Sequence, residues 1–169
     1  MKPTAIVYQS NAGHTRRYAE LFARLSALPA YDLQRAHSTL QKNDMIIFFG
    51  WLMAGTLQGY QKAARRYQVS AVCVVGMGHP GDGQVETIAK KYRFDLANAF
   101  YLQGGLDLEK LHGLYGFMMK TMSRFMGPAL EKKDGKSPEE IEMLAMLKDG
   151  GDFVSEDHLE PLMAWYKAQ

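Results

Sequence analysis

The sequence contains little of what a secreted or membrane-spanning protein needs. It has one cysteine, Cys73, so no disulfide forms within the chain. Its five histidines are scattered, and none lies at the spacing of a zinc site. No apolar run reaches the roughly 18 residues of a transmembrane helix, and the first residues lead into a strand-like run instead of a signal peptide. We therefore expect a cytoplasmic protein that folds without disulfides or a structural metal.

The sequence also lacks a dense run of basic residues and any nucleic-acid-binding motif, so no nucleic acid partner is expected. Residues 1–130 nevertheless carry 15 Lys and Arg against 8 Asp and Glu, whereas residues 131–169 carry 5 against 10. Two interpretations stay open. Either the basic part attracts anions such as phosphates or lipid headgroups, or the acidic C-terminal part covers it.

Apolar runs typical of strands alternate with segments of helical periodicity. The runs predict strands at 4–8, 44–50, 70–76 and 99–104, with a further short edge strand at 31–37. The periodicity predicts helices at 15–28, 56–67, 85–92, 107–127 and 137–167. Strands that alternate with helices in this way indicate an α/β fold, in which helices cover both faces of a parallel sheet.

The loop after the first strand carries the strongest chemical signal. It reads Gln9-Ser10-Asn11-Ala12-Gly13-His14-Thr15 and opens a helix. Unpaired N–H groups at a helix start attract anions, small residues let a phosphate approach the backbone, and the hydroxyls of Ser10 and Thr15 can donate to its oxygens. A turn that only caps the helix is the alternative interpretation. The loop has neither the Gly-Lys-Ser/Thr ending of a P-loop nor the G-x-G-x-x-G of a dinucleotide site.

These residues resemble the flavodoxin signature. The matching pattern is Ile6-Val7-Tyr8-x-Ser10-x-x-Gly13-x-Thr15-x-x-x-Ala19-x-x-Phe22, with Phe22 in place of an aliphatic residue. Within this superfamily the chain is most similar to the group that contains the flavodoxin-type protoporphyrinogen oxidase. The features similar to that group are the run 43–50 before a long loop and Gly104-Gly105-Leu106-Asp107 before a Met- and aromatic-rich helix.

The resemblance implies a flavodoxin-like, doubly wound sheet of five parallel strands in the order 2-1-3-4-5. It implies one domain over residues 1–169, with a helical insertion at about 107–136 after the fifth strand. It also implies an FMN site at the carboxyl ends of the strands, where the order reverses between the first and third strands, as flavodoxin itself illustrates. The implied FMN-binding residues are Ser10, Asn11, Ala12, Gly13, His14 and Thr15 for the phosphate, and Trp51, Leu52, Met53, Ala54, Met77, Gly78, His79 and Asp82 for the ring system.

The two ring-binding loops depart from those of carrier flavodoxins. Many flavodoxins place a Trp just before the second Gly of the loop after the third strand; this chain has Ala54 there, and Trp51 stands three residues earlier. In the next loop, Asp82 lies near the place of the usual stacking Tyr. Trp51 either stacks on the flavin or anchors its loop in the core. His79 either bonds to the flavin edge or is an ordinary loop residue.

These features favour an FMN-dependent oxidoreductase that passes electrons from a reduced donor to a small-molecule or quinone acceptor, or to a redox protein partner. A flavodoxin-type electron carrier without substrate turnover is the second hypothesis, and a flavin-free binding module is the third. Carrier flavodoxins are typically strongly acidic, whereas only Asp82 brings an acid to the flavin loops here. No side chain is expected to serve as a catalytic acid or base, because the flavin carries the redox chemistry.

Residues 111–127 form a Met- and aromatic-rich segment with apolar residues at helical spacing. In one interpretation its wide apolar face packs on the sheet. In the other, that face is exposed to a membrane surface, a quinone or a redox partner. The second interpretation predicts weak, peripheral membrane contact.

Overall fold

The computed structural model describes residues 2–107 and 134–169, together with residues 116, 121, 124, 128 and 132. The segment 111–127 lies outside the described residues except for residues 116, 121 and 124. Its predicted packing or exposure therefore stays a prediction.

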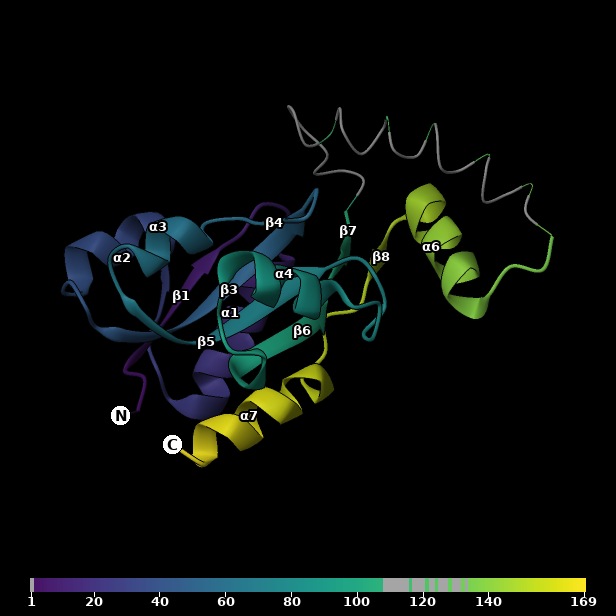
Figure 1. Ribbon diagram of the computed structural model, residues 1–169. Helices are drawn as coiled ribbons and strands as arrows, with labels where there is room; N and C mark the ends of the chain where they lie inside the picture. Colours follow the sequence, from purple (N-terminus) through teal and green to yellow (C-terminus); the bar gives the residue numbers. More distant parts are fainter. Residues whose placement is uncertain are drawn as a thin grey trace.

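Five parallel strands form the central sheet (Figure 1). Across the sheet they are β2 (Ala30–Asp32), β1 (Ala5–Gln9), β3 (Met45–Met53), β5 (Gln68–Gly76) and β6 (Ala99–Gln103). Phe48 of β3 pairs with Val7 of β1 on one side and with Val72 of β5 on the other, so β3 is the central strand. The predicted order 2-1-3-4-5 is confirmed, because β5 and β6 are the fourth and fifth of the parallel strands.

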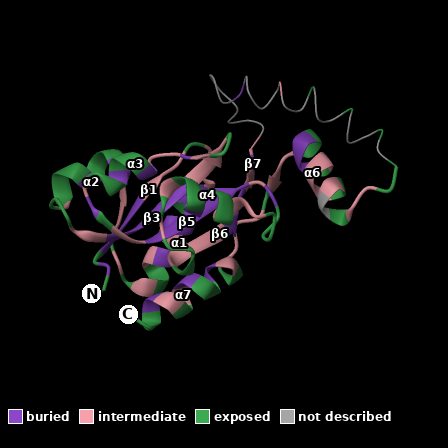
Figure 2. Ribbon diagram, viewed as in Figure 1, coloured by how far each residue is buried: buried purple, intermediate pink, exposed green. Residues whose placement is uncertain are grey.

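Helices cover both faces of this sheet. They are α1 (His14–Ser26), α2 (Leu33–Thr39), α3 (Tyr60–Ala64), α4 (Gln84–Tyr92) and α7 (Glu160–Lys167). Successive side chains of a strand point to opposite faces, so Ile46 and Phe48 of β3 join the core under α2, α3 and α4. Ile47 and Phe49 join the opposite core under α1 and α7. The fold is therefore a doubly wound α/β sheet, and the strands are its most buried part (Figure 2).

The single cysteine lies in the core beneath α1 and α7. Cys73 has no exposed surface, and burial raises the pKa of its thiol well above the usual value. Helix α7 covers this core through Leu162 and Tyr166, both of which are buried. The thiol is thus a packing group within the sheet.

Three elements predicted from the sequence have the wrong bounds. The helix predicted at 137–167 is divided into α6 (Pro138–Asp149) and α7, because β8 (Gly151–Asp152) stands between them. The segment 31–37 is a strand only as far as Asp32, because the Asp32 carboxylate accepts a hydrogen bond from the Gln34 N–H (2.9 Å) and caps α2. The helix predicted at 56–67 begins only at Tyr60, because β4 (Thr56–Leu57) first pairs antiparallel with the end of β3.

A short antiparallel pair stands at the carboxyl end of β6. Its strands are β7 (Gly105–Leu106) and β8 (Gly151–Asp152), and α6 (Pro138–Asp149) precedes β8. The two backbones approach so closely that a Cβ on Gly105 would lie 2.1 Å from the Gly151 carbonyl oxygen. Residues 107–150 therefore leave the sheet and return to it at neighbouring points.

The structure also bears on membrane insertion. Within the described ranges, no helix combines the length and the apolar content needed to cross a bilayer.

Candidate functional site

The loop after β1 is shaped by the start of α1. Gly13 is the N-cap residue and adopts a φ of 106°, a left-handed conformation that favours glycine. The Arg16 N–H donates to the Ser10 hydroxyl oxygen (3.3 Å), and the Arg17 N–H donates to the Gly13 carbonyl (3.0 Å). The Ser10 hydroxyl therefore satisfies one N–H group in the first turn of α1, whose N-cap residue is Gly13. This contact agrees with the interpretation of the loop as a helix-starting turn, and anion binding stays a prediction.

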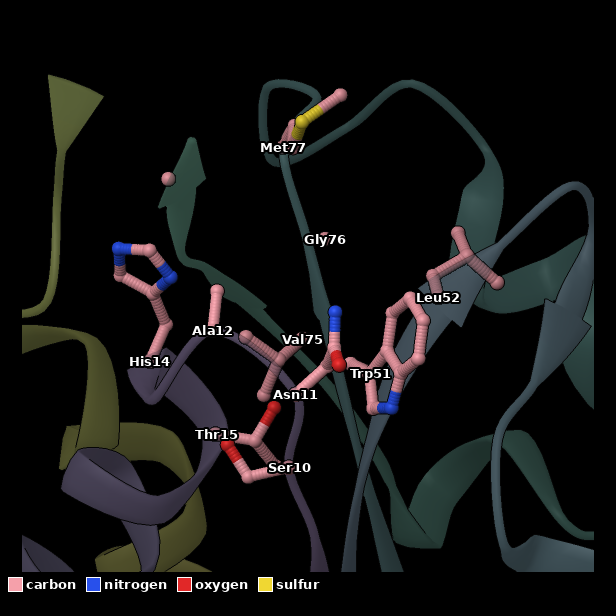
Figure 3. Close-up of a pocket in the computed structure, with 11 residues that line it drawn as sticks. Ser10, Asn11, Ala12, His14, Thr15, Trp51, Leu52, Val75, Gly76 and Met77 are labelled. Atoms are coloured by element: carbon pink, nitrogen blue, oxygen red, sulfur yellow. The ribbon is translucent and has the colours of Figure 1, made fainter. Parts of the chain in front are cut away.

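A pocket opens at the carboxyl edge of the sheet, between this loop and the ends of β3 and β5 (Figure 3). Its lining residues are Ser10, Asn11, Ala12, His14, Thr15, Trp51, Leu52, Val75, Gly76, Met77 and Gly105. None of these lining residues is acidic. The pocket lies where the strand order reverses between β1 and β3, the position at which open α/β sheets bind ligands.

The floor of the pocket is polar. Figure 3 shows the hydroxyl-bearing side chains of Ser10 and Thr15 beside one another there. Thr15 is only 2% exposed, and its side chain lines the pocket. Its hydroxyl can donate a hydrogen bond to a ligand or to water there.

Trp51 forms one wall of the pocket. The structure places it within β3, half-buried, and Figure 3 shows its indole beside Asn11 and across the pocket from His14. The same side chain also lines a neighbouring groove that Gln9 and Gln34 share. The indole therefore lines both the pocket and the neighbouring groove.

The residues after Trp51 form a hairpin where the sequence predicts a loop. Leu52 pairs with Leu57 and Met53 with Thr56. Ala54 and Gly55 make the turn with φ values of 47° and 65°, as a two-residue hairpin of primed type requires. Met53 and Ala54 therefore lie at the hairpin tip, away from the lining of the pocket.

The loop between β5 and α4 is held by hydrogen bonds to its own Asp82 and from Tyr101 of β6. The Asp82 carboxylate accepts from the His79 N–H (2.9 Å), and the Tyr101 hydroxyl donates to the Gly78 carbonyl (2.8 Å). Burial raises the pKa of Tyr101, which keeps this hydroxyl a donor. Only Met77 of this loop lines the pocket; Gly78, His79 and Asp82 do not.

His14 connects the pocket to the β7–β8 pair. Its Nε2 lies 4.0 Å from Asp152 Oδ1, and the Arg17 guanidinium makes an ion pair with the same carboxylate. Partial burial alone would raise the pKa of Asp152. The hydrogen bond from Arg17 and a further one from the Val154 N–H (3.2 Å) outweigh that effect and hold the pKa below its usual value. Asp152 is therefore a stable carboxylate near the start of α1.

A buried tyrosine links the same region to the end of β6. The Tyr18 hydroxyl lies 2.6 Å from the Gln103 carbonyl, 3.2 Å from the Phe153 carbonyl and 2.7 Å from His158 Nδ1. A carbonyl only accepts, so the hydroxyl donates to a carbonyl and accepts from His158. Burial raises the pKa of Tyr18 to about 12.

Eight of the fourteen residues expected at the FMN site line this one pocket. They are Ser10, Asn11, Ala12, His14, Thr15, Trp51, Leu52 and Met77. Sequence reasoning missed Val75, Gly76 and Gly105 as lining residues. The first two end a buried strand, and their place at the edge of the sheet follows from the parallel topology, so the strand pattern contained the signal.

The comparisons with known proteins add no family assignment. No protein-family model matches the sequence, and no curated protein shows significant similarity to it. Within the described part of the chain, no group of three or more His, Cys, Asp or Glu side chains is placed to hold a metal ion. The fold and the pocket are therefore the structural features that bear on the function of this chain.

Proposed function

We propose that the protein is an FMN-binding oxidoreductase of the flavodoxin-like type, which passes electrons from a reduced donor to a quinone or another small-molecule acceptor. The observation that carries the proposal is the pocket at the reversal of strand order. Its floor combines the start of α1 with the hydroxyls of Ser10 and Thr15, and none of its lining residues is acidic. Such a donor set suits a phosphate dianion.

The residues present fit the phosphate end of FMN. The Thr15 side chain lies on the pocket floor, where its hydroxyl would donate to a phosphate oxygen. A Cβ built on Gly13 would meet no heavy atom within 4 Å, which leaves the backbone of the loop open to an approaching ligand. Helix α1 has 13 residues, long enough for its dipole to favour an anion at this end.

The walls of the pocket fit the planar part of the cofactor. Trp51 on β3 and Met77 after β5 would flank the ring system, since indoles stack on aromatic rings and thioethers make favourable contacts with them. When bound, FMN supplies the electron-transfer chemistry. The chain itself would bind the phosphate, orient the ring and keep water from one of its faces.

The two ring-binding segments support an enzyme over a carrier. Ala54, at the position of the usual tryptophan, is exposed at the hairpin tip, and Asp82 is engaged with the His79 backbone. Neither supplies an aromatic cover for the ring. One flavin face would therefore remain accessible to a substrate, as turnover of a quinone or a similar acceptor requires.

Reconstitution tests the proposal. The purified protein, treated with FMN and freed of excess ligand, is expected to show the visible absorption bands of a flavin and to release FMN on acidification. Turnover of reduced nicotinamide with a quinone then separates an enzyme from a carrier. Retention of FMN without turnover would identify an electron carrier, and failure to retain FMN would identify a flavin-free module.

Membrane contact is a second part of this proposal and rests on the sequence of residues 111–127. A quinone acceptor dissolved in a membrane would require the protein to reach the bilayer surface, and Lys110, Lys120 and Arg124 would each contribute roughly 1 kcal/mol near anionic lipids. We expect weak binding to anionic liposomes that decreases as salt increases. Absence of binding at low salt would contradict this part and leave the FMN site unaffected.

A further inference from the structure

Asp152 lies close to the candidate phosphate site, although in the sequence it follows the insertion. It is the last residue of β8, so the chain arrives there only after residues 107–150. Its carboxylate pairs with Arg17 of α1 and lies 4.0 Å from Nε2 of His14. His14 in turn lines both the candidate FMN pocket and the adjoining groove that contains Asp152. The imidazole thus lies between the pocket and a permanent carboxylate.

We infer that Asp152 is a positioning residue that holds His14 in its protonated form against the phosphate of FMN. The inference rests on the proposed function. A protonated imidazole carries a positive charge that attracts both the carboxylate and a phosphate dianion, whereas a neutral imidazole carries no such charge. Binding of the phosphate therefore takes up a proton at His14, and Asp152 makes that uptake easier.

The charged groups around His14 are consistent with this role. Those facing the same groove are Arg16, Arg17 and Glu20 on α1, Asp107 after β7, Asp149 at the end of α6, and Asp152 on β8. Of these acids, Asp152 is the one within 4.0 Å of the imidazole. Arg17 neutralises one side of that carboxylate, which limits its repulsion of a bound phosphate without removing its attraction for His14.

The pH dependence of cofactor affinity tests the inference. Histidine changes charge between about pH 5 and 8. The affinity of the apoprotein for FMN is expected to fall by about tenfold as pH rises from 6.5 to 8.5, as the loss of a charge-assisted hydrogen bond implies. Riboflavin, which has no phosphate, is expected to bind with no such dependence.

Three variants separate positioning from structure. His14→Gln keeps a donor that does not titrate, so the pH dependence is expected to disappear. Asp152→Asn keeps the acceptor for the Val154 N–H, and the fall in affinity is expected about half a unit to one unit lower in pH. Asp149→Asn removes an equal charge from the same groove and is expected to leave the profile unchanged.

The outcomes are distinct from those of the cofactor proposal. If wild-type protein binds FMN and Asp152→Asn has the wild-type profile, the inference is overturned and the FMN site stands. If Asp152→Asn weakens FMN and riboflavin equally at every pH, Asp152 only holds β8 to α1, and the inference is again overturned. If wild-type protein binds neither ligand, the proposed function itself has failed.

Discussion

The buried Thr15 hydroxyl allows the cofactor proposal to be tested at a single atom. Thr15→Val replaces this hydroxyl with a methyl group of similar size at a position that is 2% exposed. A hydrogen bond from a hydroxyl to a charged phosphate contributes about 1.5–3 kcal/mol, so the affinity for FMN is expected to fall by about ten- to 150-fold. The stability of the apoprotein is expected to stay within about 1 kcal/mol, because the change removes one hydroxyl and nearly keeps the volume of the side chain.

The assay for this variant combines two titrations. Stripped apoprotein is titrated with FMN and with riboflavin, and binding is followed by flavin fluorescence; urea unfolding of the apoprotein gives its stability. Ser10→Ala is the matched comparison. It also removes an oxygen that accepts from the Arg16 N–H, so it is expected to lower apoprotein stability by about 1 kcal/mol in addition. Unchanged FMN affinity in Thr15→Val, or an equal loss for riboflavin, would refute the assignment of Thr15 to the phosphate.

Three further outcomes are expected. If Trp51 flanks the ring, its fluorescence is quenched in the holoprotein, and this quenching is lost in Trp51→Phe. Equal quenching in both proteins would mean that the quenched residue is Trp165, which donates a hydrogen bond to Asn98 (2.7 Å). Gly105→Ala forces a Cβ against the Gly151 carbonyl and is expected to cost about 1–3 kcal/mol of unfolding free energy in urea; an unchanged value would show that β7 and β8 separate easily. Burial raises the pKa of Tyr18 from 10.0 to about 12, so this hydroxyl stabilises the fold fully below pH 10 and loses that contribution as pH rises towards 12. The free energy of unfolding of Tyr18→Phe is therefore expected to fall less between pH 9 and 11 than that of the wild type. An equal fall in both proteins would contradict the assignment.

The sheet could be predicted from the sequence because its strands are buried on both faces. Within the predicted strands 44–50 and 70–76, residues 45–50 and 71–76 carry no polar side chain, and a strand that contributes to two cores needs such residues on both faces. The loop 9–15 could be placed as well, because Ser, Asn and Gly after a strand indicate a turn, and α1 begins at His14 as that turn ends. Here local pattern and tertiary environment agree.

Other parts could not be predicted because their causes are not local. The position at which β2 ends depends on one carboxylate, that of Asp32, because this side chain caps the helix that follows. The β3–β4 hairpin turns at Ala54-Gly55, and an alanine with positive φ is not a turn signal that sequence reasoning recognises. The contact of Asp152 with Arg17 and His14 joins residues more than 130 positions apart. Such a contact follows from topology and has no signature in the sequence.

The β7–β8 pair has an evolutionary consequence. Because Leu106 and Gly151 are paired, the chain can change length between them without moving any strand of the sheet. The entropic cost of a longer loop grows only with the logarithm of its length, by about 0.6 kcal/mol for each doubling. This junction is therefore a place where segments can be gained, lost or exchanged between relatives while the pocket beneath it is inherited intact.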